Sequence, residues 1–542
     1  AGVAASSRGT LLRFGRDGHM PESQFFGISR IACAAEFLPR VVSKRGMEGK
    51  SVVVIGAGPS GITAARLIKE QGVKDVTIVE ACAHTGGRVY TNVVDADPEV
   101  RAFSAGMKPL ELGPEFLHGE ENNIFFDWIK KHGVSGKPEV TTLQLAWPNY
   151  LYFGKEGKLV SGKDSENIEE FQTMLEVFEM TEGLDPNLIP EETLLQYMVR
   201  MGTPSRMIDM ADAIFANDYG AEMSKIGLKE TAHEQQEWNY GEDYLVLDGC
   251  NYSDILADMA KGLPIRHNWV VASIDHGRAD GRVAVTNNRG ETIVADRVVS
   301  TVPVSCLRDR DISFSPPLPE GKQAAAGKIK IGNAVKAVCR LDTKFWPDDL
   351  WDVVCSDSSM PELWLTPAAD VLKSAAQGKP MKHYFMVGFV SGERADRVMQ
   401  LPKEEVKRLM LLQLDAIFGT KGNPHPASSS CSGFMVQDWG KSHFFRGAPP
   451  PVLPTVPPTV ASHDARSEPR QTSSPRVGAY TYPSPGAFGE RGVLGAPVGG
   501  KLFFAGEATQ TGCNPCLQAA METGARAAKE VAASLGAPRP KL

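Results

Sequence analysis

The spacing of apolar residues predicts alternating strands and helices near the start of the chain. Residues 51–55 form a β-branched run that ends at a glycine, which is typical of a buried strand. Residues 63–71 have a helical pattern, and residues 76–79 form a second short apolar run. A strand, a helix and a strand within about thirty residues match the size of one βαβ unit.

The later pattern indicates that distant segments continue this α/β unit and that a second region is inserted between them. Residues 121–240 are rich in helical patterns, with helices expected at 124–131 and 168–180. The other expected elements are strands at 269–274, 282–286, 297–301, 333–341 and 502–505, and helices at 404–418 and 517–535.

Two segments do not have the pattern of a packed domain. Residues 1–49 are interpreted as a frayed leader or as a transit segment, because residues 1–46 hold seven basic and three acidic side chains. Residues 448–477 contain eight prolines and no aromatic residue, so we expect a disordered insertion there. A lineage-specific loop and an unremoved intron are both consistent with that insertion.

Composition narrows the class of protein. The 542 residues are 42% hydrophobic and 23% charged, which excludes a fibrous or wholly disordered chain. The net charge of −7 gives no broad attraction for nucleic acid. No apolar run approaches the ~18 residues of a membrane span. Nine cysteines, an odd and sparse set, favour a reducing compartment over a disulfide framework.

A nucleotide-binding fingerprint follows the first expected strand. Residues 56–61 read Gly-Ala-Gly-Pro-Ser-Gly and open a helix, and Glu80 ends the next strand. Gly56 permits a tight turn, Gly58 lets the backbone approach a pyrophosphate, and Gly61 lets the helix pack on the strand. The helix N-terminus supplies N–H donors, and Glu80 would accept a hydrogen bond from a ribose hydroxyl.

A second glycine pair favours a flavin over a nicotinamide dinucleotide. Gly86-Gly87-Arg88 resembles the element with which FAD enzymes approach the pyrophosphate and the flavin edge. The sequence as a whole resembles the flavin-containing amine oxidases, most closely their polyamine-oxidase-like branch, from about Ser51 to Ser534 without the proline-rich segment. The following motifs recur in the family's order: Glu111-Leu112-Gly113, Phe116-Leu117-His118-Gly119, Asp243-Tyr244-Leu245-Val246, Ser300-Thr301-Val302-Pro303, Lys336 before Trp346, Trp439, and residues 478–482 and 504–509.

The resemblance implies non-covalent FAD and an oxidoreductase that acts on CH–NH or CH–NH2 donors. The expected reaction converts an amine, with a polyamine as the first choice, to an imine while O2 becomes hydrogen peroxide. The implied catalytic residues are Lys336, His118, Tyr480, Tyr482 and Trp439. The implied cofactor-binding residues are Gly56, Gly58, Pro59, Ser60, Gly61, Glu80, Gly87, Arg88, Val271, Gly506, Glu507 and Leu517, and no metal is expected.

Lys336 and His118 are the residues with the clearest chemical signal. Lys336 interrupts an apolar strand, and burial of an ammonium group is costly unless it is paired or functional. In the family, the matching lysine holds a water against flavin N5. His118 would bind or deprotonate a substrate ammonium, with an ordinary structural histidine as the alternative. Glu115 or Glu120 beside it could attract a polycation.

Members of the family usually hold the reacting amine between two aromatic rings. The sequence departs from the family at the second of these rings. One ring could come from Tyr480 or Tyr482, but Cys513 or Cys516 stands where the other is expected. A dithiol close to the flavin is one interpretation, and two unpaired thiols are the other. Ala479 stands where monoamine-oxidase relatives have the cysteine that attaches FAD, which is why non-covalent FAD is expected.

The expected architecture is α/β, with a Rossmann-like FAD-binding domain assembled from discontinuous segments and a mixed α+β substrate domain. The FAD-binding domain takes residues 50–120, 240–335 and 490–535, the substrate domain takes 121–239 and 336–489, and 536–542 form a tail. The terminal Lys541-Leu542 weakly resembles a peroxisomal signal, with the cytoplasm as the alternative.

Alternative functions remain open within and outside the superfamily. They are an L-amino-acid oxidase, for which Arg101 is a candidate carboxylate ligand, a histone-lysine demethylase-like oxidase, and a FAD-binding protein with little turnover. The sequence does not determine the amine, the C–N bond cleaved or the oligomeric state.

Overall fold

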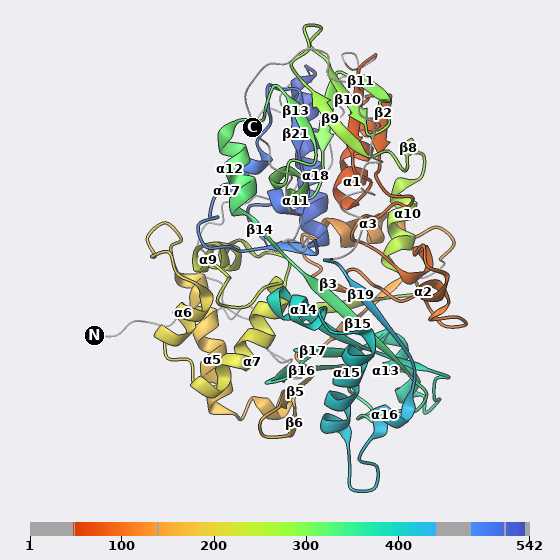
Figure 1. Cartoon of the computed structure of the whole chain (residues 1–542), viewed down its shortest axis with the longest axis vertical. Helices are drawn as coiled ribbons and strands as arrows, with labels where there is room; N and C mark the ends of the chain where they lie inside the picture. Colours follow the sequence, from red (N-terminus) through yellow and green to blue (C-terminus); the bar gives the residue numbers. More distant parts are fainter. Residues whose placement is uncertain (1–46, 48, 138–139, 441–477, 514–515, 537–542) are drawn as a thin grey trace, which may run out of the picture.

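The computed structural model describes residues 47, 49–137, 140–440, 478–513 and 516–536. Two lobes meet at the middle of the molecule (Figure 1). The expected insertion at 448–477, most of the expected leader and the last six residues lie outside the described residues.

A five-stranded parallel sheet forms the centre of the first lobe. Its order is β21-β12-β1-β2-β8, with the bounds β1 Ser51–Ile55, β2 Asp75–Val79, β8 Ile265–Arg266, β12 Arg297–Ser300 and β21 Leu502–Phe504. Strands from the beginning, middle and end of the chain pair in register, for example Val53 with Val298 and Val298 with Leu502. The expected Rossmann-like sheet built from discontinuous segments is therefore confirmed.

Helix α1, Pro59–Glu70, begins four residues before the expected start. Proline is favoured at the first helical position, so the glycine-rich turn leads directly into the helix. Helix α18, Leu517–Ser534, packs closely against α1, since a Cβ at Gly524 would lie 2.2 Å from the Ser60 carbonyl oxygen. Apolar clusters cover both faces of the parallel sheet.

Smaller sheets and helices complete the first lobe. A four-stranded sheet has the order β11-β10-β9-β13, with β9 Val271–Asp275, β10 Val283–Asn287, β11 Thr292–Ala295 and β13 Ser313–Ser315. The helices of this lobe are α3 Ile124–His132, α10 Tyr252–Ala260, α11 Val304–Arg308, α12 Glu320–Lys328 and α17 Glu490–Gly495.

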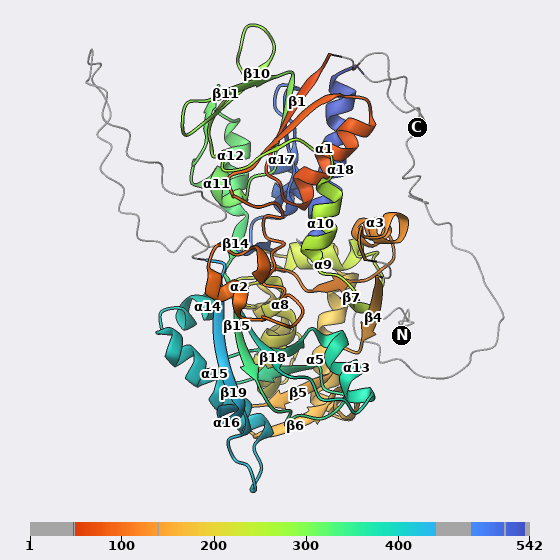
Figure 2. The ribbon, with the colours of Figure 1, turned by 90° about the vertical axis from the view of Figure 1, so that its right-hand side faces the viewer.

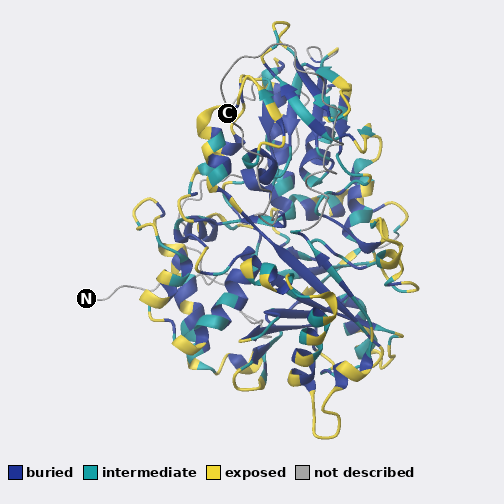
Figure 3. Cartoon of the chain, in the orientation of Figure 1, coloured by how far each residue is buried: buried dark blue, intermediate teal, exposed yellow. Residues whose placement is uncertain are grey.

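The second lobe contains a seven-stranded mixed sheet. Its order is β19-β15-β18-β17-β16-β5-β6, with β19 Cys431–Asp438, β15 Ala334–Leu341, β18 Tyr384–Ser391, β17 Glu362–Thr366, β16 Asp352–Ser356, β5 Tyr150–Phe153 and β6 Lys158–Ser161. Its strands are largely buried (Figure 3). The helices around it are α4 Gly162–Ser165, α5 Glu169–Glu179, α6 Leu194–Arg200, α7 Ile208–Ala211, α8 Asn217–Tyr219, α9 Leu228–Glu237, α13 Ala368–Ala376, α14 Gly392–Val398, α15 Lys403–Phe418 and α16 Pro426–Ser430.

Two short sheets lie where the lobes meet (Figure 2). The three-stranded sheet has the order β3-β7-β4, with β3 Phe116–His118, β7 Tyr244–Asp248 and β4 Thr141–Leu145. The two-stranded sheet pairs β14 Lys330–Gly332 with β20 Tyr480–Tyr482. A further short helix, α2, spans Pro98–Ala102. Among the described residues, no helix has the length and apolar character needed to span a bilayer.

Candidate active site

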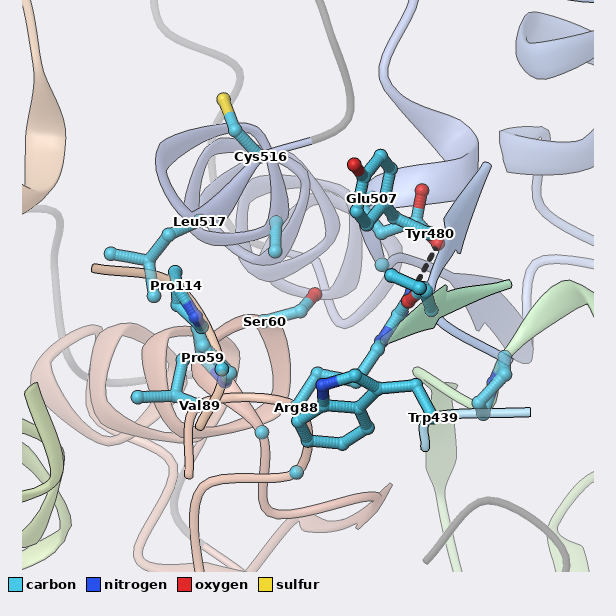
Figure 4. A pocket seen from close by; sticks show the side chains of 18 of the residues that line it. Pro59, Ser60, Arg88, Val89, Pro114, Trp439, Tyr480, Glu507, Cys516 and Leu517 are labelled. Atoms are coloured by element: carbon cyan, nitrogen blue, oxygen red, sulfur yellow. Dashed lines mark hydrogen bonds and ion pairs between the residues drawn. The ribbon is translucent and has the colours of Figure 1, made fainter. Parts of the chain in front are cut away.

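A cavity of about 710 Å³ extends between the two lobes. At one end it is bounded by the glycine-rich turn before α1 and by β9, and at the other by the seven-stranded sheet. All expected site residues line it except Gly61 and Tyr482. Figure 4 labels several of the lining residues, including Ser60, Arg88 and Trp439.

The glycine-rich turn has the geometry of a phosphate cradle. A Cβ at Gly61 would lie 2.0 Å from the Gly56 carbonyl oxygen, so this glycine serves the close packing of α1 and does not line the cavity. A Cβ at Gly58 would have open space, with its nearest neighbour 3.9 Å away. The backbone at Gly58 can thus be approached by a ligand.

Glu80 joins the turn to the second strand of the unit. Its Oε2 accepts a hydrogen bond from the Ala57 N–H at 2.6 Å, and its Oε1 accepts one from the Cys82 N–H at 2.8 Å. These bonds fix the carboxylate at the cavity wall while leaving lone pairs on each oxygen for a hydroxyl donor. Val271 lines the same end of the cavity.

Arg88 and Glu507 connect the cavity floor to the second lobe. The Arg88 guanidinium donates to Glu507 Oε1 at 2.8 Å and to the Ala479 carbonyl oxygen at 2.7 Å (Figure 4). The other Glu507 oxygen accepts from the Thr481 hydroxyl at 2.6 Å, and Arg491 donates to that hydroxyl. This buried network holds Gly506 and Glu507 in place, but it uses part of their capacity to bind a ligand.

The N-terminus of α18 points its first turn at the cavity. Leu517 and Gln518 line it, and Gln518 Nε2 is a buried donor that has no hydrogen-bond partner among the described residues. An unpartnered buried donor at the positive end of an 18-residue helix suits an electron-rich ligand atom. The turn, Glu80, Arg88 and this helix start together fit a flavin dinucleotide.

Lys336 lies on β15 and is 4% exposed. Its Nζ donates to the Glu111 carbonyl oxygen at 3.0 Å and to Glu115 Oε2 at 3.2 Å. The same Glu115 oxygen accepts from Trp364 Nε1 at 2.9 Å. The buried ammonium is therefore paired, which makes its burial tolerable beside the cavity.

A second carboxyl group near Lys336 is held neutral by its surroundings. Burial raises the pKa of Glu111 to about 8, and the Glu115 charge acts in the same direction, while a hydrogen bond from Tyr252 N–H and Lys336 oppose it. Glu111 Oε2 is buried without a partner. Glu115, and not Glu111, is the carboxyl group that forms the ion pair with Lys336.

The other expected catalytic residues are placed differently from one another. Burial lowers the pKa of His118 to about 4, so its imidazole is neutral at physiological pH and is a weak base. Tyr480 lines the cavity and packs against Gly220, where a Cβ would lie 2.6 Å from its ring. Trp439 also lines it and donates to the Leu112 carbonyl oxygen at 3.0 Å. Tyr482 instead packs against the helical core of the second lobe.

The sequence analysis missed two carboxyl groups in the second-lobe end of the cavity. Asp218 lines the cavity from α8, and Glu362 lines it from β17 and is 3% exposed. Glu362 Oε1 accepts from Trp147 Nε1 at 3.3 Å. Neither carboxyl group has an ion-pair partner in the described ranges. Of the two proposed acids near His118, Glu115 lines the cavity and Glu120 does not.

Charge repulsion and burial act together on these acids. Burial raises the pKa of Asp218 to about 7. Burial also raises the pKa of Glu362, with further contributions from Asp218 and Asp352. Asp352 is fully buried, and within the described part of the chain its Oδ2 has no hydrogen-bond partner. Glu362 has little signal in the sequence, because it is the first residue of its strand and, unlike Lys336, does not interrupt an apolar run.

Cys516 lines the cavity, and Cys513 lies beside it in contact with Tyr240. The Tyr240 hydroxyl lies 3.2 Å from Cys513 Sγ and donates to Glu522 at 2.8 Å. Both cysteines are free thiols, and burial together with Cys513 raises the pKa of Cys516. The described part of the chain contains no cluster of side chains that could hold a metal ion.

The chain matches a known protein family over most of its length. A family profile described as "Flavin containing amine oxidoreductase" matches residues 59–532. The chain belongs to this flavin-containing amine oxidoreductase family. The expected family is thereby confirmed, and FAD is the cofactor that the family implies for the cavity.

Curated relatives of this family fall into two groups. The chain is 28% identical to a "Lysine-specific histone demethylase 1 homolog 2" of Arabidopsis thaliana over 93% of its own length and 60% of the relative. It is 26% identical to a "Probable polyamine oxidase 4" of the same species, over 74% of this chain and 77% of that protein. A third relative, "Lysine-specific histone demethylase 1 homolog 3", is covered over only 30% of its length.

Solved structures share the fold. A putrescine oxidase with bound putrescine superposes with a TM-score of 0.66 at 17% identity, covering 89% of this chain and 99% of the other. A cyclohexylamine oxidase from Brevibacterium oxydans also gives a TM-score of 0.66, at 19% identity, covering 90% of this chain and 99% of that one. These likenesses establish the two-lobed fold.

Proposed function

We propose that the chain oxidises an amine at FAD in this cavity and that its preferred substrate is a di- or polyamine. FAD, when bound, accepts two electrons from the C–H bond beside the amine nitrogen and passes them to O2, so that the products are an imine and hydrogen peroxide. The residues of the chain bind the cation, orient it and exclude water. The observation that carries the polyamine assignment is the pair of cavity carboxyl groups, Asp218 and Glu362.

Charge balance supports a cationic substrate. Arg88 is paired with Glu507, and Lys336 is paired with Glu115, so these two cations are already balanced. Asp218 and Glu362 have no ion-pair partner among the described residues and burial raises the pKa of both, so an ammonium group of the ligand would stabilise their ionised forms. A ligand with one amine at the reacting position has no second charge for them, whereas a di- or polyamine has one.

The walls of the cavity suit the same ligand. Trp147, Trp364 and Tyr244 line the end that contains the carboxyl groups. Aromatic faces attract ammonium groups, and their apolar area matches the methylene chain between two amines. Neutral His118 can accept a hydrogen bond from a substrate ammonium, while its lowered pKa of about 4 makes it a weak base.

A histone-lysine demethylase-like activity is the second candidate. It is favoured by the 28% identity to a demethylase homologue, although the chain spans 60% of that relative. An amino-acid oxidase receives less support, because Arg101 binds the Asp95 and Ala96 carbonyl oxygens and does not line the cavity. A cofactor-binding protein with little turnover would combine bound FAD with no peroxide release on any amine.

A peroxide-release assay separates these candidates. The panel contains putrescine, spermidine, spermine, a monoamine, L-amino acids and a methyl-lysine histone peptide. We expect the highest kcat/KM with a di- or polyamine. Asp218→Asn and Glu362→Gln should raise KM for the diamine by about tenfold or more, the equivalent of one charged hydrogen bond. The monoamine is the matched control, and equal losses for both substrates would contradict the assignment of these carboxyl groups.

A further inference from the structure

A pair of thiols, Cys339 and Cys431, lies in the seven-stranded sheet away from the cavity. Cys339 is in β15 and is fully buried, while Cys431 begins β19 and is half-buried. The Cys339 thiol donates to Met410 Sδ at 3.5 Å and the Cys431 thiol to the Gly433 carbonyl oxygen at 3.4 Å, and each cysteine perturbs the pKa of the other. Both are free thiols, and neither lines the cavity.

A β-bulge brings the two thiols together. In the ladder between β15 and β19, Arg340 pairs with Gly433, but Leu341 pairs with Cys431, so Ser432 is left over. The extra residue turns Cys431 to the sheet face that carries Leu341 and Cys339. Arg340 holds the bulge, since its guanidinium donates to the Ser432 carbonyl oxygen at 3.0 Å and to the Ser432 hydroxyl at 3.2 Å.

The surroundings distinguish the two thiols. The interaction with Cys339 lowers the pKa of Cys431 to about 6, a backbone hydrogen bond at Gly433 and the cations Lys407 and Arg340 contribute, and burial opposes them. The same interaction and burial raise the pKa of Cys339. Cys431 is thus the more acidic and the more accessible of the two thiols, and Cys339 is the buried one. A low-pKa accessible cysteine beside a second cysteine is the arrangement of thiols that react with peroxides.

We propose that Cys431 and Cys339 form a peroxide-reactive pair, in which Cys431 is oxidised and Cys339 resolves it to a disulfide. The Cys431 thiolate attacks one oxygen of a hydroperoxide, so that an S–O bond forms, the O–O bond breaks and the other oxygen leaves with a proton as water or alcohol. The Cys339 sulfur then attacks the Cys431 sulfenic acid. An S–S bond forms, the S–O bond breaks, and the hydroxide leaves as water with the thiol proton. Two thiols lose two electrons, and one peroxide is reduced.

The two thiols lie on the same strands as residues of the candidate active site. Strand β15 also carries Lys336, and Trp439 directly follows β19. Hydrogen peroxide is the product of the proposed function, so the reagent would be formed within the same molecule. The proposal itself rests only on the two thiols, because added peroxide tests it without turnover.

The first test measures thiol reactivity in the full-length, FAD-loaded protein. Alkylation by iodoacetamide is followed for each cysteine by mass spectrometry between pH 5 and pH 10. Cys431 is expected to react with a midpoint near pH 6. Half-buried Cys250 is the internal control, because burial raises its pKa to about 12. A midpoint for Cys431 above pH 8 would overturn the proposal.

The second test uses one equivalent of hydrogen peroxide. A disulfide-linked peptide pair containing residues 339 and 431 is expected in the parent protein. Cys339→Ser should stop at a Cys431 sulfenic acid that dimedone captures, Cys431→Ser should give neither product, and Cys250→Ser should behave as the parent. Failure of the parent to form the linked peptides, or oxidation of Cys250 first, would refute the pair. The parent measurement requires no variant, and a negative result would leave the amine-oxidation assay unaffected.

Discussion

Replacement of Lys336 by methionine tests the centre of the site. Methionine keeps the length of the side chain but removes the ammonium, which donates to the Glu111 carbonyl oxygen at 3.0 Å and to Glu115 at 3.2 Å. Glu115, whose side chain is 7% exposed, would then keep only the Trp364 indole N–H as a partner. The variant therefore creates a buried carboxylate without a counter-charge.

The unpaired carboxylate sets the expected loss of stability in the Lys336→Met variant. Removal of one partner from a buried ion pair costs about 3–5 kcal/mol of unfolding free energy. Glu115→Gln together with Lys336→Met removes both charges, so the double variant should regain most of the loss. Urea unfolding of the parent, both single variants and the double variant gives the coupling energy directly.

The catalytic effect is separate from the stability effect. In the double variant, which restores charge balance, we still expect flavin reduction or reoxidation to be slower by one to several orders of magnitude, about 2–4 kcal/mol of barrier. Stopped-flow absorbance of the FAD-loaded protein measures both half-reactions. Unchanged rates in the double variant would remove Lys336 from the mechanism, and a stability loss below about 1 kcal/mol in Lys336→Met would refute the buried pair.

Four further outcomes are expected. Purified protein should be yellow and release intact FAD on acid precipitation, whereas colour that stays in the pellet would indicate a covalent bond. Because the pKa of Asp218 is about 7, KM for a diamine should fall about tenfold per pH unit from pH 5 to 7 as the carboxylate forms and then level off, and Asp218→Asn should abolish this slope. Deletion of residues 448–477 should leave soluble, FAD-binding protein, as judged by expression and flavin absorbance. A fluorescent protein carrying the last ten residues should enter peroxisomes and become diffuse when Lys541-Leu542 is removed.

The cofactor end of the cavity was predictable because its signals are local. The glycine-rich turn, Glu80 and Gly86-Gly87-Arg88 lie within about thirty residues, the length of one βαβ unit, whose geometry is well defined. The substrate end depends on long-range pairing. Asp218 comes from a short helix and Glu362 from a strand, and no spacing in the sequence relates them.

Tyr482 also shows that contacts between distant parts of the chain are not predictable from local sequence. From the sequence, either Tyr480 or Tyr482 could supply one of the two rings that flank the amine in the family, and residues two apart on a strand do face the same side. The second tyrosine is displaced along β20 by roughly 7 Å, two residue steps of a strand. At that point the helices of the second lobe cover the strand, so Tyr482 packs into their core and Tyr480 alone lines the cavity. The local sequence pattern does not predict at which residue the strand begins to contact the second lobe.

The register of the seven-stranded sheet explains how the cavity keeps unbalanced carboxyl groups. Lys336 on β15 pairs with Phe389 on β18, and Phe389 pairs with Glu362 on β17, so all three side chains share one face of the sheet. Adjacent strands are about 5 Å apart, which separates Lys336 and Glu362 by roughly 10 Å at the backbone, with the Phe389 position between them. The lysine is instead engaged by Glu115, which immediately precedes β3. Lys336 is only the last of the effects on the pKa of Glu362, which burial raises, so an ammonium group that enters the cavity would stabilise the ionised carboxylate.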